Sequence, residues 1–231
     1  MKYVGMIEDT VDQEVTIIAK NNKILVFDID NTLYKETMEI VIRRREAGYA
    51  LLKDELDMSF KEFFKLSDAY TKEYGTNYKG FITNYKLKPE TILKINEVDA
   101  DLGFTPNEEL VELIKSLPFT KVCFTNANIG QTRNTLRRIG LEELMDYIFY
   151  VKYEPGKNVL CKPYLKAYEV VDTVINKDKK NKILFFDDNS DNIGTANDFG
   201  WDGVGVPSYE RICEAIAVHV YKYFDYDIRE H

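Results

Sequence analysis

Four short polar clusters hold the residues of this sequence that are best suited to chemistry. In chain order they are Asp28-Ile29-Asp30, Thr125-Asn126, Lys162 and Asp187-Asp188. If the four carboxylates lay a few ångströms apart, they would repel one another by several kcal/mol at an effective dielectric constant of about 20. Such a group coexists only beside a cation or with raised pKa values. One divalent ion and Lys162 would together nearly balance it, so the residue types predict a metal ion among the aspartates.

The ligand chemistry favours magnesium and phosphate. The clusters offer oxygen atoms and contain no histidine or cysteine, which selects a hard cation. Mg²⁺ is usually held by one or two carboxylates together with the phosphate of its substrate. The sequence therefore predicts a magnesium site that handles phosphoryl groups.

Each cluster has an expected role in phosphoryl transfer. Asp28 can act as the nucleophile and form an aspartyl-phosphate. Asp30 lies two residues further and points to the same side if the chain is extended, so it can protonate the leaving oxygen and then activate water, provided that its pKa is raised. Thr125 and the N–H groups after it can hold phosphoryl oxygens, and Lys162 can neutralise their charge. Asn126 is either a further phosphate contact or a turn-forming residue.

Buried strands must position these clusters. The expected strands, which are short apolar runs bounded by polar residues, are 23–28, 121–125 and 182–187. The expected helices between them are 106–117, 129–139 and 163–175. This alternation predicts an α/β fold with a doubly wound, parallel, Rossmann-like sheet. Ligands bind beyond the carboxyl ends of such strands, which is where the clusters lie.

One block interrupts the alternation. Residues 36–105 contain the helix-like stretches 37–56, 60–74 and 90–96 and no convincing strand, and the block is too long for a simple crossover. We expect an all-helical cap inserted after the first core strand. The expected domains are a core of 23–35 and 106–231, a cap of 36–105 and an N-terminal extension of 1–22. Within that extension, 14–19 is a candidate edge strand.

The composition describes an ordinary globular chain with an acidic balance. The 231 residues are 45% apolar and 30% charged, which excludes intrinsic disorder as the main state. The net charge of −8 argues against binding to a nucleic acid polymer, which depends on clustered Lys and Arg. A small phosphorylated substrate is still possible, because a local site can be positive. We expect a monomer, since no heptad pattern indicates a partner chain.

Several signals predict a cytoplasmic protein. The apolar runs are only a few residues long, far short of the about 20 that a membrane-spanning helix needs, so we expect no membrane partner. The first residues, MKYVGMIEDTVDQE, have acids where a signal peptide has an apolar stretch. Cys123, Cys161 and Cys213 lie far apart and are odd in number, which indicates free thiols in a reducing compartment.

The motifs resemble those of a known superfamily. Residues 27–33 (FDIDNTL) resemble the first motif of the haloacid dehalogenase-like (HAD) hydrolases. Thr125, Lys162 and Asp187-Asp188 match the second, third and fourth motifs in order, so that the resemblance spans residues 23–206. A closer resemblance, to the pyrimidine 5′-nucleotidase branch of fungi and plants, is carried by FDIDNTLY, KEYG with Lys79-Gly80, FTNA, VLCKPYLKAYE and FFDDNSDNI. That branch has a helical cap after its first motif.

The resemblance implies an activity and a ligand set. It implies a phosphatase that removes the 5′-phosphate of nucleoside monophosphates, with UMP and CMP preferred. It also implies that Asp28, the backbone carbonyl of Asp30 and Asp188 bind Mg²⁺, while Asp187 supports the site without touching the ion. In relatives with an acid pair at this point, the second acid is the direct ligand.

Three residues of the expected cap are candidate contacts for a nucleoside, namely Tyr74, Asn77 and Lys79. Relatives of this branch often place arginine where this chain has Lys79, and the two cations differ in geometry and stacking. The alternative is that these side chains pack within the cap.

Other functions share parts of the pattern. A phosphatase for a sugar phosphate or another small phosphomonoester would have the same fold and motifs, because the cap decides the substrate. A haloacid dehalogenase needs neither the acid at Asp30 nor magnesium. A signalling receiver also places Asp, Thr and Lys around Mg²⁺, but its phosphorylated Asp comes after the paired acids. An inactive scaffold is disfavoured, because every motif residue is present.

Overall fold

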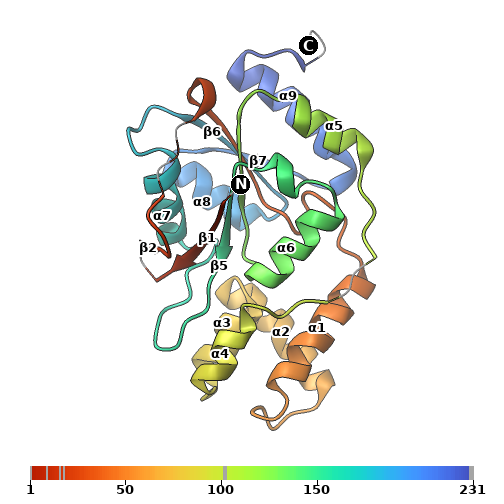
Figure 1. Cartoon of the computed structure of the whole chain (residues 1–231). Helices are drawn as coiled ribbons and strands as arrows, with labels where there is room; N and C mark the ends of the chain where they lie inside the picture. Colours follow the sequence, from red (N-terminus) through yellow and green to blue (C-terminus); the bar gives the residue numbers. More distant parts are fainter. Residues whose placement is uncertain (1, 9, 16, 18, 101–102, 229–231) are drawn as a thin grey trace.

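The fold is built around a mostly parallel β-sheet (Figure 1). The computed structural model describes residues 2–8, 10–15, 17, 19–100 and 103–228. In this part of the chain seven strands lie in the order β2-β1-β5-β4-β3-β6-β7, and only the pairing of β1 with β2 is antiparallel. The strands are β1 (Lys2–Ile7), β2 (Thr10–Val11), β3 (Lys23–Phe27), β4 (Thr120–Phe124), β5 (Tyr147–Val151), β6 (Lys182–Asp187) and β7 (Asp202–Gly205).

Helices cover both faces of the sheet, because alternate strand residues point to opposite sides. In β3, the even-numbered residues belong to one buried apolar cluster, and Leu25 and Phe27 belong to another. The first cluster includes residues of α7 and α8, and the second includes residues of α5, α6 and α9. These helices are α5 (Glu108–Ser116), α6 (Ile129–Arg138), α7 (Leu165–Ile175), α8 (Ser190–Phe199) and α9 (Ile212–Phe224). The layers confirm the predicted doubly wound α/β fold.

Between β3 and α5 the chain forms a helical lobe, at the bottom of Figure 1. Its helices are α1 (Met38–Leu52), α2 (Phe60–Tyr74), α3 (Asn77–Asn84) and α4 (Pro89–Ile95). No strand lies among residues 36–100 and 103–105, which are the described part of this block. Local signals set the starts of two helices, because Thr37 accepts a hydrogen bond from Ile40 N and Ser59 forms a capping box with Glu62.

Two features of the lobe depart from the expected helices. α1 ends at Leu52, where 56 was expected, and α3 was not expected. Gly75 ends α2 with φ of +82°, a left-handed conformation that favours glycine. α3 is then held by tertiary packing, because Phe81 stacks on Phe63 of α2 with ring centres 4.7 Å apart. Because this packing joins two helices and leaves no local pattern in the sequence, α3 could not be predicted from the sequence.

The expectation for the N-terminal segment is wrong. β1 pairs in parallel with β5, and β2 pairs with β1 at the edge, so these residues complete the core sheet and are no separate extension. The candidate strand at 14–19 is not found in residues 14, 15, 17 and 19, whereas residues 16 and 18 lie outside the described residues. The apolar pattern of β1 is short, and its partner β5 lies about 140 residues away in the sequence.

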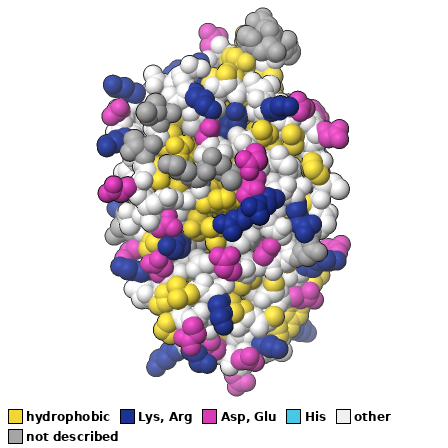
Figure 2. Space-filling view, in the orientation of Figure 1, with side chains coloured by type: hydrophobic (Ala, Val, Ile, Leu, Met, Phe, Trp, Pro, Cys, Tyr) yellow, Lys and Arg dark blue, Asp and Glu magenta, His cyan; other side chains and the backbone are white. Residues whose placement is uncertain are grey.

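The surface mixes charges of both signs. On the face shown in Figure 2, Lys and Arg side chains are interspersed with Asp and Glu, with small apolar patches between them. Within the described ranges, no helix has both the length and the apolar character needed to cross a membrane.

Candidate active site

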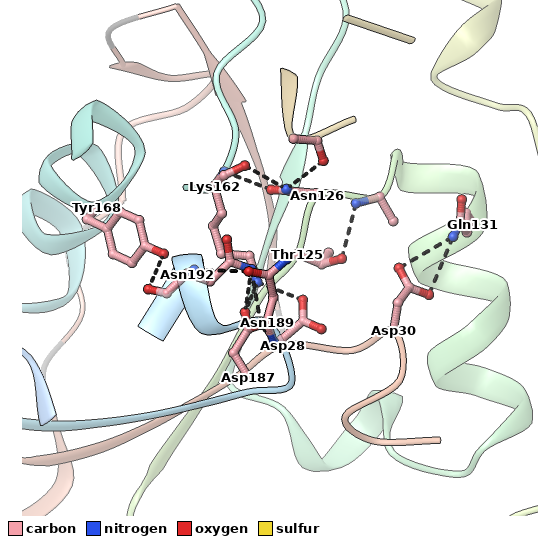
Figure 3. A network of polar contacts seen from close by, with 12 residues as sticks. Asp28, Asp30, Thr125, Asn126, Gln131, Lys162, Tyr168, Asp187, Asn189 and Asn192 are labelled. Carbon is pink, nitrogen blue, oxygen red and sulfur yellow. Dashed lines mark hydrogen bonds and ion pairs between the residues drawn. The ribbon is translucent and has the colours of Figure 1, made fainter. Parts of the chain in front are cut away.

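The carboxyl ends of three neighbouring strands bring the predicted residues together. β3 lies between β4 and β6, and these strands lead into Asp28, Thr125 and Asp187. The Asp28 N–H donates to the Phe186 carbonyl at 2.8 Å, which continues the β3–β6 pairing up to the acid. Figure 3 shows these side chains gathered near Lys162, which comes from the loop before α7. The fold thus places the motif residues at one edge of the sheet.

A cavity of about 310 Å³ opens at this edge and has two walls. The core wall includes Asp28, Asn126, Lys162 and Asp188. The lobe wall includes Val41, Arg44 and Arg45 of α1, Thr71 of α2, and Asn77 and Tyr78 of α3. A ligand in the cavity would therefore contact both the motif residues and the helical lobe.

Lys162 is the centre of the core wall. It is fully buried, and its Nζ lies 2.7 Å from Asp28 Oδ1 and 2.6 Å from Asp187 Oδ2. Burial alone would lower the pKa of Lys162, but the carboxylates of Asp187 and Asp28 outweigh it and raise that pKa. The rings of Phe124 and Phe185 flank the ammonium, each with its centre 5.2 Å away. Lys162 is therefore a fixed positive charge beside the expected nucleophile.

One lysine does not balance the carboxylates around it. Burial raises the pKa of Asp28 well above its ordinary value, Lys162 opposes this, and Asp187 and Asp30 add to it. Burial, together with these two neighbouring carboxylates, thus outweighs the effect of Lys162 on the pKa of Asp28. A further cation at this point would allow both buried acids to ionise.

Three carboxylates are arranged as such a cation would need. Asp28, Asp187 and Asp188 each offer an oxygen within 4.8 Å of the others. An all-oxygen set of this kind fits Mg²⁺. The carboxylate of Asp187 already accepts from Lys162 Nζ, from Asn189 N at 2.8 Å and from Asn192 Nδ2 at 2.9 Å.

Asp188 differs from Asp187 in its surroundings. It is exposed, and its Oδ2 accepts from Asn31 Nδ2 at 2.9 Å. This contrast favours Asp188 as the direct ligand and Asp187 as a supporting residue. The choice between the two stays a prediction.

Asp30 does not have the raised pKa on which its expected acid and base role depends. Its Oδ1 accepts from Tyr34 Oη at 2.5 Å and from Arg44 Nη1 at 2.8 Å. Burial alone would raise the pKa of Asp30, but the Arg44 charge and the Tyr34 hydrogen bond outweigh it and lower that pKa. Figure 3 shows the Asp30 side chain turned toward Gln131 of α6. Arg44 and Tyr34 thus hold this acid in its charged form.

The side chains of the two residues after β4 both form hydrogen bonds within the protein. Thr125 Oγ1 accepts from Ala127 N at 3.1 Å. The Asn126 amide donates to the carbonyls of Gly75, at 3.0 Å, and of Lys162, at 2.8 Å, and its Oδ1 accepts from Lys162 N at 2.8 Å. The Asn126 side chain therefore ties the end of α2 to the Lys162 loop. A phosphate contact from Asn126 would fall to its backbone N–H.

Of the predicted lobe contacts, only Asn77 lines the cavity. The hydroxyl of Tyr74 instead accepts from Asn84 at 3.4 Å. The Lys79 ammonium lies over the ring of Tyr164, 3.7 Å from its centre. Tyr74 and Lys79 thus contact Asn84 and Tyr164 and lie outside the cavity lining.

The sequence reading missed the two arginines of the lobe wall. Arg44 and Arg45 stand in a basic run of α1, which by its sequence alone resembles a solvated helix face. Arg44 Nη1 binds Asp30 at 2.8 Å and Glu36 at 2.9 Å, and its Nη2 donates to Thr135 of α6 at 3.0 Å. No helical or strand spacing predicts these contacts, because the partners lie 14, 8 and 91 residues away from Arg44.

Comparison with known proteins gives distant relatives. No family model matches the chain. The chain is 28% identical over 192 residues to Phosphate metabolism protein 8 of Saccharomyces cerevisiae, which covers 77% of this chain and 59% of the yeast protein. The chain therefore spans about three fifths of the length of this curated relative.

Solved structures with a similar arrangement are also found. The L-2-haloacid dehalogenase of Xanthobacter autotrophicus is 17% identical, with a TM-score of 0.47, over 79% of this chain and 76% of that one. A HAD-hydrolase of Bacillus subtilis, solved with magnesium bound, is 18% identical, with a TM-score of 0.43, over 80% and 86%. The site itself therefore has to indicate the reaction of this chain.

Proposed function

We propose that this chain is a magnesium-dependent phosphatase that uses Asp28 as its nucleophile. The observation that carries the proposal is the cluster of Asp28, Asp187 and Asp188 within 4.8 Å, next to the buried Lys162. Three carboxylates and one lysine leave a net negative charge that a metal ion would neutralise. The metal ion and the lysine would then bind a phosphate together. The similarity to a yeast protein named for phosphate metabolism supports the same chemistry.

In the proposed reaction, an oxygen of Asp28 forms a bond to phosphorus while the bond to the leaving oxygen breaks. Asp30 gives a proton to that leaving oxygen. In the second step Asp30 takes a proton from a water molecule, whose oxygen bonds to phosphorus while the bond between phosphorus and Asp28 breaks, so that inorganic phosphate is released. The incoming phosphate adds negative charge near Asp30, which would raise its pKa toward the value this role needs. Lys162 and the N–H groups after Thr125 hold the phosphoryl oxygens.

The metal ion is proposed to be held by Asp28, the backbone carbonyl of Asp30 and Asp188, with Asp187 behind them. When bound, Mg²⁺ supplies positive charge that neutralises the phosphate and the acids around it. The protein's own contribution is to fix these oxygens at the ends of packed strands.

The proposed substrate is a nucleoside monophosphate, with UMP and CMP preferred, as the resemblance implies. The helical lobe would act as the cap that closes over it and excludes water. Lys79, to which the resemblance gives a base contact, lies outside the cavity lining. This favours keeping a sugar phosphate or another small phosphomonoester as the second candidate. We further propose a cytoplasmic monomer that acts on neither nucleic acid polymers nor membranes.

The test is phosphate release from UMP, CMP, AMP, GMP and ribose 5-phosphate, with Mg²⁺ and with EDTA. We expect Mg²⁺-dependent release that Asp28→Asn abolishes and that Asp191→Asn, an exposed acid of α8, leaves unchanged. Wild-type turnover by Asp28→Asn would refute the proposal. Halide release from a 2-haloacid in EDTA would show a dehalogenase, and a stable phosphorylated Asp28 would show a receiver.

A further inference from the structure

Two adjacent arginines of the lobe wall differ in how well they are paired. Arg44 has short contacts to Asp30, Tyr34, Glu36 and Thr135, all between 2.7 and 3.0 Å. Arg45 is almost as buried, with 15% of its side chain exposed against 11% for Arg44. Its contacts are long, because Nη2 lies 3.4 Å from Asp68 Oδ1 and 3.4 Å from Thr71 Oγ1.

Arg45 therefore keeps hydrogen-bond donors that the described residues do not use well. A guanidinium carries five N–H donors, and burying them without good acceptors is costly. Asp68 gives little compensation, because 60% of its side chain is exposed to solvent. Burial accordingly lowers the pKa of Arg45, although Asp68, Tyr78 and Glu36 oppose that shift. A ligand in the cavity would supply the missing acceptor.

The other residues of the cavity restrict what this acceptor can be. Glu36 and Asp99 also line the cavity, so a second full negative charge would face two acids. The aliphatic members of the lining are Val41, Val98 and Ala127, which offer little surface to a hydrocarbon tail. A ligand group that is polar but uncharged would avoid both the repulsion by the two acids and the lack of apolar surface. A carbonyl oxygen is such an acceptor, and the planar guanidinium of Arg45 can donate hydrogen bonds to it.

We propose that Arg45 is a specificity-determining residue, which donates hydrogen bonds to a carbonyl oxygen of the leaving group while the core wall holds the phosphate. The substrates are then phosphomonoesters whose leaving group carries a carbonyl-bearing ring, as UMP does. This inference rests on the proposed function, because it takes the phosphate to bind at Asp28 and Lys162. It adds that selection depends on Arg45 of α1, whereas the sequence pointed to Tyr74, Asn77 and Lys79.

Binding to a catalytically silent protein tests the proposal. In the Asp28→Asn background, the dissociation constants of UMP and ribose 5-phosphate would be measured by calorimetry with Mg²⁺. Arg45→Met keeps the length of the side chain and removes its donors. Arg43→Met is the matched control, because Arg43 lies on the same helix with half of its side chain exposed.

We expect Arg45→Met to reduce the preference for UMP over ribose 5-phosphate at least tenfold, and Arg43→Met to change it less than twofold. An unchanged preference in Arg45→Met would overturn the inference and leave the phosphatase proposal intact. If neither ligand binds any of these proteins, the proposed substrate class fails and the inference fails with it.

Thermal unfolding separates this role from a structural one. A buried charge with poor partners can be replaced by an apolar side chain at little cost. We therefore expect Arg45→Met to keep or raise the melting temperature, while Arg44→Met lowers it by several degrees. If Arg45→Met lowered the melting temperature as much as Arg44→Met does, Arg45 would be a structural residue of the lobe, and the proposal would be overturned.

Discussion

The two walls of the cavity differ in how closely their cations are paired. In the core wall, Lys162 is buried, and its Nζ lies 2.7 Å from Asp28 and 2.6 Å from Asp187, which stands behind the wall. In the lobe wall, Arg44 is also closely paired, but the contacts of the neighbouring Arg45 are 3.4 Å long. The comparison indicates that the reaction is fixed by the sheet, while selectivity can change with single residues of the lobe.

The largest effect should come from breaking the core wall. Lys162→Met leaves two buried carboxylates without their cation, which should lower stability by about 3–5 kcal/mol. The pKa of Asp28, already raised by burial, should rise further. A carboxyl with a raised pKa in the folded state contributes stability at low pH that is lost as the pH rises. Urea unfolding should therefore show a larger loss at pH 8 than at pH 5.

The control for this variant is Lys166→Met on α7, because Lys166 is half exposed and pairs with Glu169 at 3.2 Å. Its expected change is within about 0.5 kcal/mol, as for other surface substitutions. Equal losses in Lys162→Met and Lys166→Met would contradict the description of the core wall.

A second variant removes the link between the walls. Arg44→Met leaves Asp30 and Glu36 without their shared cation, and urea unfolding should show a loss of about 3 kcal/mol. Turnover should fall more than KM rises, because Asp30 loses its position without loss of the phosphate site. A rise in KM with unchanged turnover would instead assign Arg44 to substrate binding.

Metal binding should distinguish Asp188 from Asp187 as the direct ligand. An ion present at 100 times its dissociation constant stabilises the folded state by about 2.7 kcal/mol. Mg²⁺ should thus raise the melting temperature of the wild type, and Asp188→Asn should remove most of that rise. Asp191→Asn should retain it. A full rise in Asp188→Asn would move the metal ligand to Asp187.

The smallest effect should come from the contact between Asn126 and the lobe. Asn126→Ala breaks the hydrogen bonds to Gly75 and Lys162 and should cost about 1–2 kcal/mol. Asn84→Ala, which removes a bond to Gly80 at the exposed end of α3, should cost less. Phosphate release by Asn126→Ala should fall, because the Lys162 loop is less well held. Unchanged stability and unchanged phosphate release in Asn126→Ala would show that packing alone holds the Lys162 loop.

The sequence predicted the core wall because its cause is local. A short apolar run such as 182–187 indicates a buried strand, and the polar residue at its end then lies at the ligand-binding edge. The residues of the lobe wall are placed by packing between helices, which leaves no local pattern in the sequence. Arg44 and Arg45 look like a solvated basic run, and only the packing of α1 against α6 and α2 gives them different partners.

Contacts between separate segments also explain why the sequence indicated neither the charged state of Asp30 nor the place of the N-terminal strand. Nothing near Asp30 in the sequence shows that Arg44 and Tyr34 lower its pKa, although Tyr34 is only four residues away. β1 depends on pairing with β5, which local propensity does not encode. Tyr74 and Lys79 have side chains suited to contact a nucleoside, but the packing of α2 and α3 places them outside the cavity lining.

The place of β3 in the sheet has a consequence for how the molecule opens. β3 has a strand on each side, so its amide hydrogens exchange with solvent only when the sheet itself separates. The helices of the lobe lack such neighbours, and we expect their amides to exchange in smaller openings. Asp28 would then stay in its folded setting while the lobe wall of the cavity unfolds and reforms around it.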